Sequence, residues 1–179
     1  MKTKRLVHSL CCLCLMTSSS MAGGSGLFGS YWSTEDADAG YGGGIKAIVG
    51  DGRLALELRG TYFGDLTDDV GPADIDLQAI PAEAGLLFTL GETADVVFHI
   101  GAGGGYYFLD SDQGDIDDEI GWYASGGLDL KITPNVALFA EAVYRQVEGT
   151  APDDQFEDID GNVDFSLNGA GVNVGLAFR

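Results

Sequence analysis

Apolar and polar positions alternate along residues 120–147. Every second residue of 120–132 is apolar or small, and beyond the short connection 133–135 the same holds for positions 138–144. The positions between them carry polar or charged side chains, among them Tyr123, Asp129, Glu141 and Arg145. Such alternation on both sides of a tight turn predicts a β-hairpin. Each arm has the length that a tilted strand needs to cross a bilayer, roughly ten residues, so we interpret this segment as a membrane hairpin.

The same pattern predicts eight strands in all. They cover residues 25–33, 41–49, 53–63, 77–90, 96–109, 120–132, 136–147 and 165–178. Short connections at 50–52, 91–95 and 133–135 alternate with longer ones, rich in Asp and Gly, at 34–40, 64–76, 110–119 and 148–164. Short turns at one end and long loops at the other are typical of outer-membrane barrels. The predicted fold class is therefore all-β, an eight-stranded antiparallel up-and-down transmembrane β-barrel.

The first strand does not reveal which of its faces points inward. Leu27, Gly29 and Tyr31 form one face, and Phe28, Ser30 and Trp32 form the other. Both faces mix apolar and small residues, so both assignments stay open.

Aromatic residues support a membrane location. Every Tyr and Trp lies at the loop end of a strand: Tyr31, Trp32, Tyr41, Tyr62, Tyr106, Tyr107, Trp122, Tyr123 and Tyr144. Such residues form girdles where the membrane meets water. Phe88, Phe98 and Phe178 lie nearer the turn ends and predict a second girdle there.

The first 22 residues predict a secretory signal peptide. Lys2, Lys4 and Arg5 precede an apolar run at 6–16, and small residues reach Ala22, where we expect cleavage. We expect residues 23–179 to form one barrel domain. All three cysteines lie in the signal segment, so this domain should contain neither disulfides nor cysteine metal sites.

Acidic residues dominate the rest of the chain. Three of the nine Lys and Arg residues lie in the signal segment. The rest of the chain has six basic residues and 28 Asp and Glu, which gives it a net charge of −22. The long loops and adjoining strand ends hold 21 of these 28 acidic residues and no Lys or Arg. Nucleic acid is excluded as a partner, because phosphate binding needs a basic surface. Acidic loops suit cations or basic partners.

Charged residues also lie on the face opposite the apolar one, where they predict a network inside the barrel. The set is Lys46, Glu57, Arg59, Glu83, His99, Asp129, Lys131, Glu141 and Arg145. Side chains just fill the lumen of an eight-stranded barrel, and charges there must be paired. We expect a packing network that stiffens the barrel; the alternative is a gated conductance path through rearranging ion pairs.

His99 and the glycine run of residues 101–105 both lack the context that chemistry would require. His99 has no serine two residues away and lies near the turn end of its strand, which argues against histidine-based catalysis, and no catalytic residue is assigned. The glycine run 101–105 is followed by 106–109, Tyr-Tyr-Phe-Leu, rather than by the helix that a phosphate-binding loop requires.

The last loop resembles the first half of a calcium-binding loop. Oxygen ligands stand at alternate positions, Asp158, Asp160, Asn162 and Asp164. Val163 replaces the glycine of the EF-hand turn, and Gly169 replaces its final glutamate. We expect a solvated acidic loop, with weak binding of calcium or magnesium, bridging to lipopolysaccharide, as the alternative.

Taken together, the strand pattern, the glycine-rich strands at 41–44 and 101–107 and the closing strand 171–179 resemble the small eight-stranded outer-membrane barrels. This group includes the OmpA transmembrane domain and the OmpX and OmpW types. The resemblance implies a Gram-negative outer-membrane location, contact with outer-membrane lipid and lipopolysaccharide, and insertion by the barrel assembly machinery. We expect a monomer.

The leading functional hypothesis is a non-enzymatic, porin-like outer-membrane barrel whose acidic extracellular loops serve envelope integrity or surface interaction. The alternative is a soluble periplasmic lipocalin-like barrel that binds a small apolar ligand. A soluble barrel should be charged outside and apolar inside, and the strands show the opposite pattern.

Overall fold

The computed structural model describes residues 23–35, 39–50, 52–68, 75–111, 118–151 and 163–179. These described residues form the strands β1 (Gly23–Thr34), β2 (Gly40–Val49), β3 (Leu54–Asp68), β4 (Ile75–Glu92), β5 (Val96–Ser111), β6 (Glu119–Thr133), β7 (Val136–Ala151), β8 (Val163–Ser166) and β9 (Gly169–Phe178). The expected signal peptide, residues 1–22, lies outside the described residues. Within them, no helix is long and apolar enough to cross a membrane.

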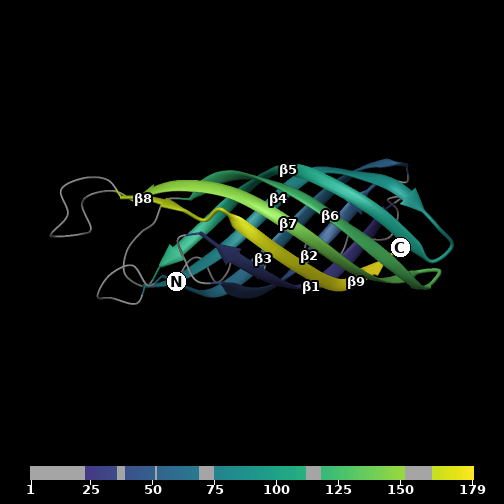
Figure 1. The fold of residues 1–179 in the computed structure, drawn as a ribbon, viewed down its shortest axis with the longest axis horizontal. Helices are drawn as coiled ribbons and strands as arrows, with labels where there is room; N and C mark the ends of the chain where they lie inside the picture. Colours follow the sequence, from purple (N-terminus) through teal and green to yellow (C-terminus); the bar gives the residue numbers. More distant parts are fainter. Residues whose placement is uncertain (1–22, 36–38, 51, 69–74, 112–117, 152–162) are drawn as a thin grey trace.

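The sheet closes on itself. Each strand from β1 to β7 pairs antiparallel with the next, and β9 joins β7 to β1. The eight strands β1 to β7 and β9 form the closed wall, and the barrel is elongated with its strands tilted (Figure 1). This confirms the predicted eight-stranded antiparallel up-and-down architecture.

The predicted eighth strand, 165–178, is interrupted in the structure. Its first part is β8, four residues that pair only with the end of β7. Leu167 and Asn168 break the ladder: the Leu167 amide donates to the Val147 carbonyl at 3.0 Å, and the Asn168 side chain accepts from the Val147 amide at 2.8 Å. Of these two strands, β9 therefore belongs to the closed barrel wall and β8 does not.

The two ends of the barrel differ as predicted. Figure 1 shows the short turns after β4 and β6 together at the right end, while β8 lies at the left. Gly50, which follows β2, has a φ of 126°, a conformation that favours glycine in such a tight turn. We call the two sides the turn end and the loop end.

Apolar side chains cover the outside of the barrel. The exposed large residues include Leu54, Leu56, Leu58, Leu130, Leu138 and Leu176, whereas Glu57, Arg59, Asp129, Glu141 and Arg145 on the same strands are buried inside. This arrangement suits lipid outside and paired charge inside, the reverse of a soluble lipocalin-like barrel. It follows from strict alternation of side chains along a strand.

The face of the first strand is now assigned. Phe28, Ser30 and Trp32 are buried inside, and Leu27 and Tyr31 are exposed. The inward face of β1 was not evident from the sequence because Gly29 and Ser30, one on each face, are both small.

The aromatic girdle at the loop end is smaller than predicted. Trp32, Tyr107 and Tyr123 are buried inside the barrel rather than exposed at the interface. Each stands next to an exposed aromatic residue (Tyr31, Tyr106 or Trp122), and consecutive residues of a strand must point to opposite faces. The outward group is Tyr31, Tyr41, Tyr62, Tyr106, Trp122 and Tyr144, and Phe88, Phe98 and Phe178 are exposed nearer the turn end.

Candidate functional site: the barrel interior

The structure brings most of the predicted interior charges together. Eight of the nine residues are buried: Lys46, Glu57, Arg59, Glu83, His99, Asp129, Glu141 and Arg145. They project from strands β2 to β7, all with the parity that points into the lumen. We call these eight residues the charge network.

Arg59 lies at the centre of the charge network. In the sheet it stands directly between Lys46 on β2 and Glu83 on β4. Its guanidinium forms ion pairs with Glu57, with Glu141 at 3.2 Å and with Glu83 at 3.6 Å. One cation thus joins three carboxylates from three strands.

A second cation, Arg145, extends the charge network toward the loop end. Its Nε donates to Glu83 Oε1 at 2.9 Å, and the hydroxyl of Tyr107 donates to the same oxygen at 2.9 Å. The guanidinium carbon lies 5.2 Å from the centre of the Trp32 ring. Burial of this charge is therefore compensated by a carboxylate and an aromatic face.

On the turn side, Lys46 and His99 complete the charge network. Lys46 Nζ lies 3.9 Å from Glu57 and 3.6 Å from the centre of the Phe139 ring. His99 lies between two carboxylates, with Nδ1 at 3.8 Å from Asp129 and Nε2 at 3.7 Å from Glu141. Its environment is that of a packed interior histidine.

The ninth predicted residue, Lys131, lies apart from the buried eight. Its side chain is 28% exposed and pairs with Glu92 at 2.5 Å near the turn end. Arg179 instead pairs with Asp129 at 2.7 Å. Lys46, Arg59, Arg145 and Arg179 therefore balance the four buried carboxylates. Residues 173, 177 and 179 are separated by even numbers of positions, so they point to the same face of the strand. This spacing could have shown that Arg179 points inward, toward Asp129.

Uncharged polar partners were missed in the sequence. Asn173 Nδ2 donates to Glu141 at 3.0 Å, and the Ser30 hydroxyl donates to the side-chain Oδ1 of Asn173 at 2.6 Å. Both residues are buried. A search for inward-facing polar residues, rather than charges alone, would have found Asn173.

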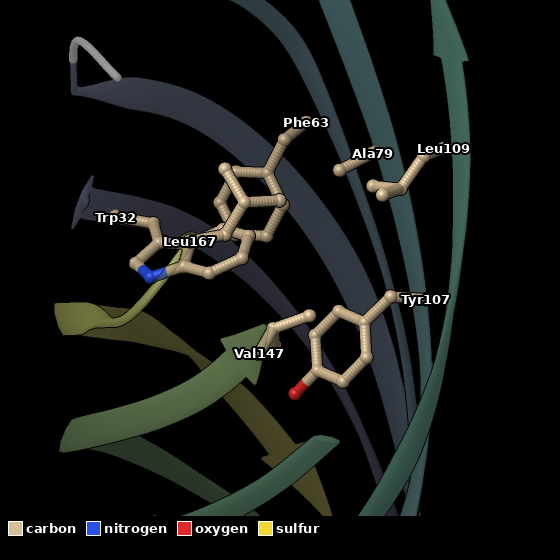
Figure 2. Close-up of a cluster of buried hydrophobic side chains, with 7 residues drawn as sticks. All are labelled: Trp32, Phe63, Ala79, Tyr107, Leu109, Val147 and Leu167. Carbon is tan, nitrogen blue, oxygen red and sulfur yellow. The ribbon is translucent and has the colours of Figure 1, made fainter. Parts of the chain in front are cut away.

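Apolar side chains close the lumen on both sides of the charge network. The loop-end cluster consists of Trp32, Phe63, Ala79, Tyr107, Leu109, Val147 and Leu167 (Figure 2). Figure 2 shows these side chains converging from several strands into the space that the wall encloses. The turn-end cluster consists of Phe28, Ala137, Phe139 and Ala177.

The glycine run of β5 has a packing role. It lies within the sheet and precedes no helix, so it lacks the geometry of a phosphate-binding loop. A Cβ at Gly103 would lie 2.2 Å from the Ala84 carbonyl oxygen and 2.5 Å from the Gly85 Cα. Glycine is required here because the two strands approach closely.

The remaining candidates for chemistry are His99 and the acidic residues of the last loop. His99 Nε2 and Ser125 Oγ each lack a hydrogen-bond partner there, so they do not form a nucleophile and base pair. No group of three or more metal-ligating side chains occurs among the described residues. Of the possible calcium ligands, Asp158, Asp160 and Asn162 lie outside the described residues, and only the backbone of Asp164 is described, in β8.

Comparison with known proteins agrees with the closed barrel. A family model for the outer membrane protein beta-barrel domain matches residues 13–178. No curated protein matches the chain. Among solved structures, OprG of Pseudomonas aeruginosa is similar at 15% identity with a TM-score of 0.67, covering 88% of this chain and 96% of that one.

Two further structures have the same fold. Neisserial surface protein A is similar at 18% identity with a TM-score of 0.59, covering 88% of this chain and 95% of that one. Outer membrane protein W of E. coli is similar at 12% identity with a TM-score of 0.56, covering 89% and 99%.

Proposed function

The chain belongs to the outer membrane β-barrel family, and from this premise we propose that it is a non-enzymatic, non-conducting barrel that supports envelope integrity and presents acidic loops for surface interactions. The observation that carries this proposal is the filled lumen. A paired charge network lies between two apolar clusters, and its side chains contact one another across the whole interior.

The filled lumen favours structural support over transport. Ion passage would require separation of Arg59 from three carboxylates and displacement of Trp32 and Phe63 from the loop-end cluster. Each broken pair would leave a charge buried without compensation, at a cost of roughly 3–5 kcal/mol. Gated conductance, the alternative from the sequence, has to overcome this cost.

Planar bilayers test the closed state. The protein refolded into lipid, checked by its shift in gel mobility on heating, should give no single-channel steps under conditions where a general porin conducts. Discrete steps from the wild-type protein would overturn the non-conducting proposal.

The envelope and surface roles separate in cells. Cells without the protein should become more sensitive to detergent, and the wild-type chain should restore resistance. A variant with Glu35, Asp110, Asp118 and Glu148 changed to their amides should restore resistance yet adhere less to a polylysine-coated surface. Unchanged detergent sensitivity without the protein would refute the envelope role, and unchanged adhesion of the variant would refute the loop role.

A further inference from the structure

A hollow lies on the outer wall at the loop ends of β6 and β7, away from the lumen. Its volume is about 380 Å³, and it is lined by Ile120, Gly121, Trp122, Gln146 and Glu148. Trp122 and Gln146 are direct neighbours across the two strands. Gly121 contributes only backbone, so four outward side chains surround the hollow.

The lining combines apolar faces with one carboxylate. Ile120 is 76% exposed and Trp122 is 47% exposed. The Tyr144 ring lies 5.9 Å from the Trp122 ring and extends the aromatic surface. The Gln146 amide donates to Glu148 Oε1 at 3.0 Å, which orients the carboxylate. An exposed indole face beside a carboxylate suits an organic ammonium group.

The distribution of basic residues favours a cation over an anion at this hollow. Beyond the signal segment, Lys46, Arg59 and Arg145 are buried in the lumen, and Arg53, Lys131 and Arg179 lie near the turn end. Among the described residues, a phosphate group therefore meets no exposed basic side chain at the loop end. The acidic loops add a field that concentrates cations.

A metal ion fits this hollow poorly. The lining contains a single carboxylate, and the described residues include no group of three metal-ligating side chains. Calcium takes roughly six to eight oxygen ligands. The combination of one carboxylate with indole and aliphatic faces is better matched by a cation that carries an apolar body.

The wall below the hollow leaves room for an apolar chain. Toward mid-barrel the outward positions are small, with Gly104 beside Trp122, Ala102 beside Ala124, and Gly126 beside Ala142. A Cβ at Gly126 would meet only Ile100, at 3.9 Å. We call this run of small outward residues the trough.

We propose that the hollow binds the ammonium headgroup of an amphipathic molecule that lies in the leaflet at the loop end. The ammonium group contacts Glu148 and the Trp122 ring, and the apolar chain lies along the trough. This inference goes beyond the proposed function, because neither a sealed lumen nor acidic loops require a lipid-level binding site.

Trp122 reports occupancy directly. The chain has two tryptophans, and Trp32 is fully buried in the barrel, so a contact quencher in the apolar phase reaches only Trp122. The probes are a chain-brominated dodecyltrimethylammonium and dodecyl maltoside with the same brominated chain. Each is titrated into refolded protein in neutral micelles. The ammonium probe should reach half-quenching at a mole fraction about threefold lower than that of the maltoside probe. A ratio of about threefold is what the free energy of one exposed ion pair would produce.

Two variants separate a site from general surface charge. Glu148→Gln should abolish the advantage of the ammonium probe, whereas Glu35→Gln, a matched loss of charge elsewhere at the loop end, should preserve it. Equal quenching by both probes would overturn the proposal, as would an equal loss in the two variants. Heat-dependent gel mobility confirms that each variant is folded, and failure here leaves the conductance test unaffected.

Discussion

The charge network and the loop-end cluster occupy neighbouring levels of one lumen but depend on different physics. At the level of Arg59, each side chain has several partners, and three carboxylates share one guanidinium. At the level of Phe63 and Leu167, side chains contribute mainly apolar area. Tyr107 connects the two, because its ring packs in the loop-end cluster and its hydroxyl donates to Glu83 of the charge network.

This difference determines how each level responds to damage. Loss of one charge leaves its partners buried and unpaired, so the cost exceeds the value of the lost contact. Loss of an apolar side chain leaves a cavity whose cost scales with its size. The charge network should therefore fail as a unit, and the loop-end cluster should weaken step by step.

The largest effect is expected from Arg59→Met. It removes the cation shared by Glu57, Glu83 and Glu141, and the free energy of unfolding should fall by roughly 3–5 kcal/mol. Urea unfolding in lipid vesicles, followed by gel mobility, measures it. Arg53→Met, an exposed arginine at the turn end, is the matched control and should change stability little. Similar losses in the two variants would contradict a shared central cation.

Leu167→Ala should have a smaller effect. Leu167 is buried in the loop-end cluster, and its truncation should cost about 2–3 kcal/mol. The same unfolding assay applies, with the outward-facing Leu176→Ala as control. An equal loss at Leu176 would show that the loop-end cluster has no special role.

Tyr107→Phe tests the connection between the two levels. The ring stays in the loop-end cluster, but the hydrogen bond to Glu83 is lost, at a cost of about 1.5 kcal/mol. Tyr144→Phe, whose ring faces outward, should be nearly neutral in the same assay. If both variants are neutral, the hydroxyl does not join the two levels.

The smallest effect is expected at the turn end, where Lys131 lies outside the charge network. Its hydrogen bond holds the pKa of the exposed Glu92 below its ordinary value. A lowered pKa stabilises the folded state above the unfolded-state pKa, and this contribution disappears as the pH falls through the folded-state pKa.

Lys131→Gln should raise the pKa of Glu92 without a measurable loss of stability at neutral pH. Titration of the Glu92 carboxyl carbon by NMR measures the shift. An unchanged pKa would show that the Lys131 contact is absent in solution.

Strand faces were predictable because lipid and lumen impose opposite requirements on alternate residues. Leu54, Leu56 and Leu58 alternate with Glu57 and Arg59, so the face of β3 was clear in the sequence. In β1 both faces combine small and large apolar residues, so the inward face is seen only in the closed barrel, where β1 pairs with β2 and β9. Trp32 was predicted to lie in the girdle because the position of a residue along a strand does not show whether its side chain points inward or outward.

The partners within the lumen could not be derived from parity alone. Parity placed Arg59 and Glu141 inside, but their contact depends on the reach of both side chains across the lumen. Lys131 pairs with Glu92 and Arg179 pairs with Asp129, and both pairings depend on where the barrel wall meets the turns. The break between β8 and β9 depends on the Asn168 contact with Val147, which has no local sequence motif.

The seam between β1 and β9 imposes an order on assembly. Ser30 and Asn173 meet across it although 143 residues separate them, so closure depends on a contact of the kind that forms slowly in folding. Until β9 arrives, β1 and β7 present open edges that can pair with other chains. A chain without its last strand should therefore aggregate instead of forming a narrower barrel, and the cell has to keep the whole chain unfolded until that strand is delivered.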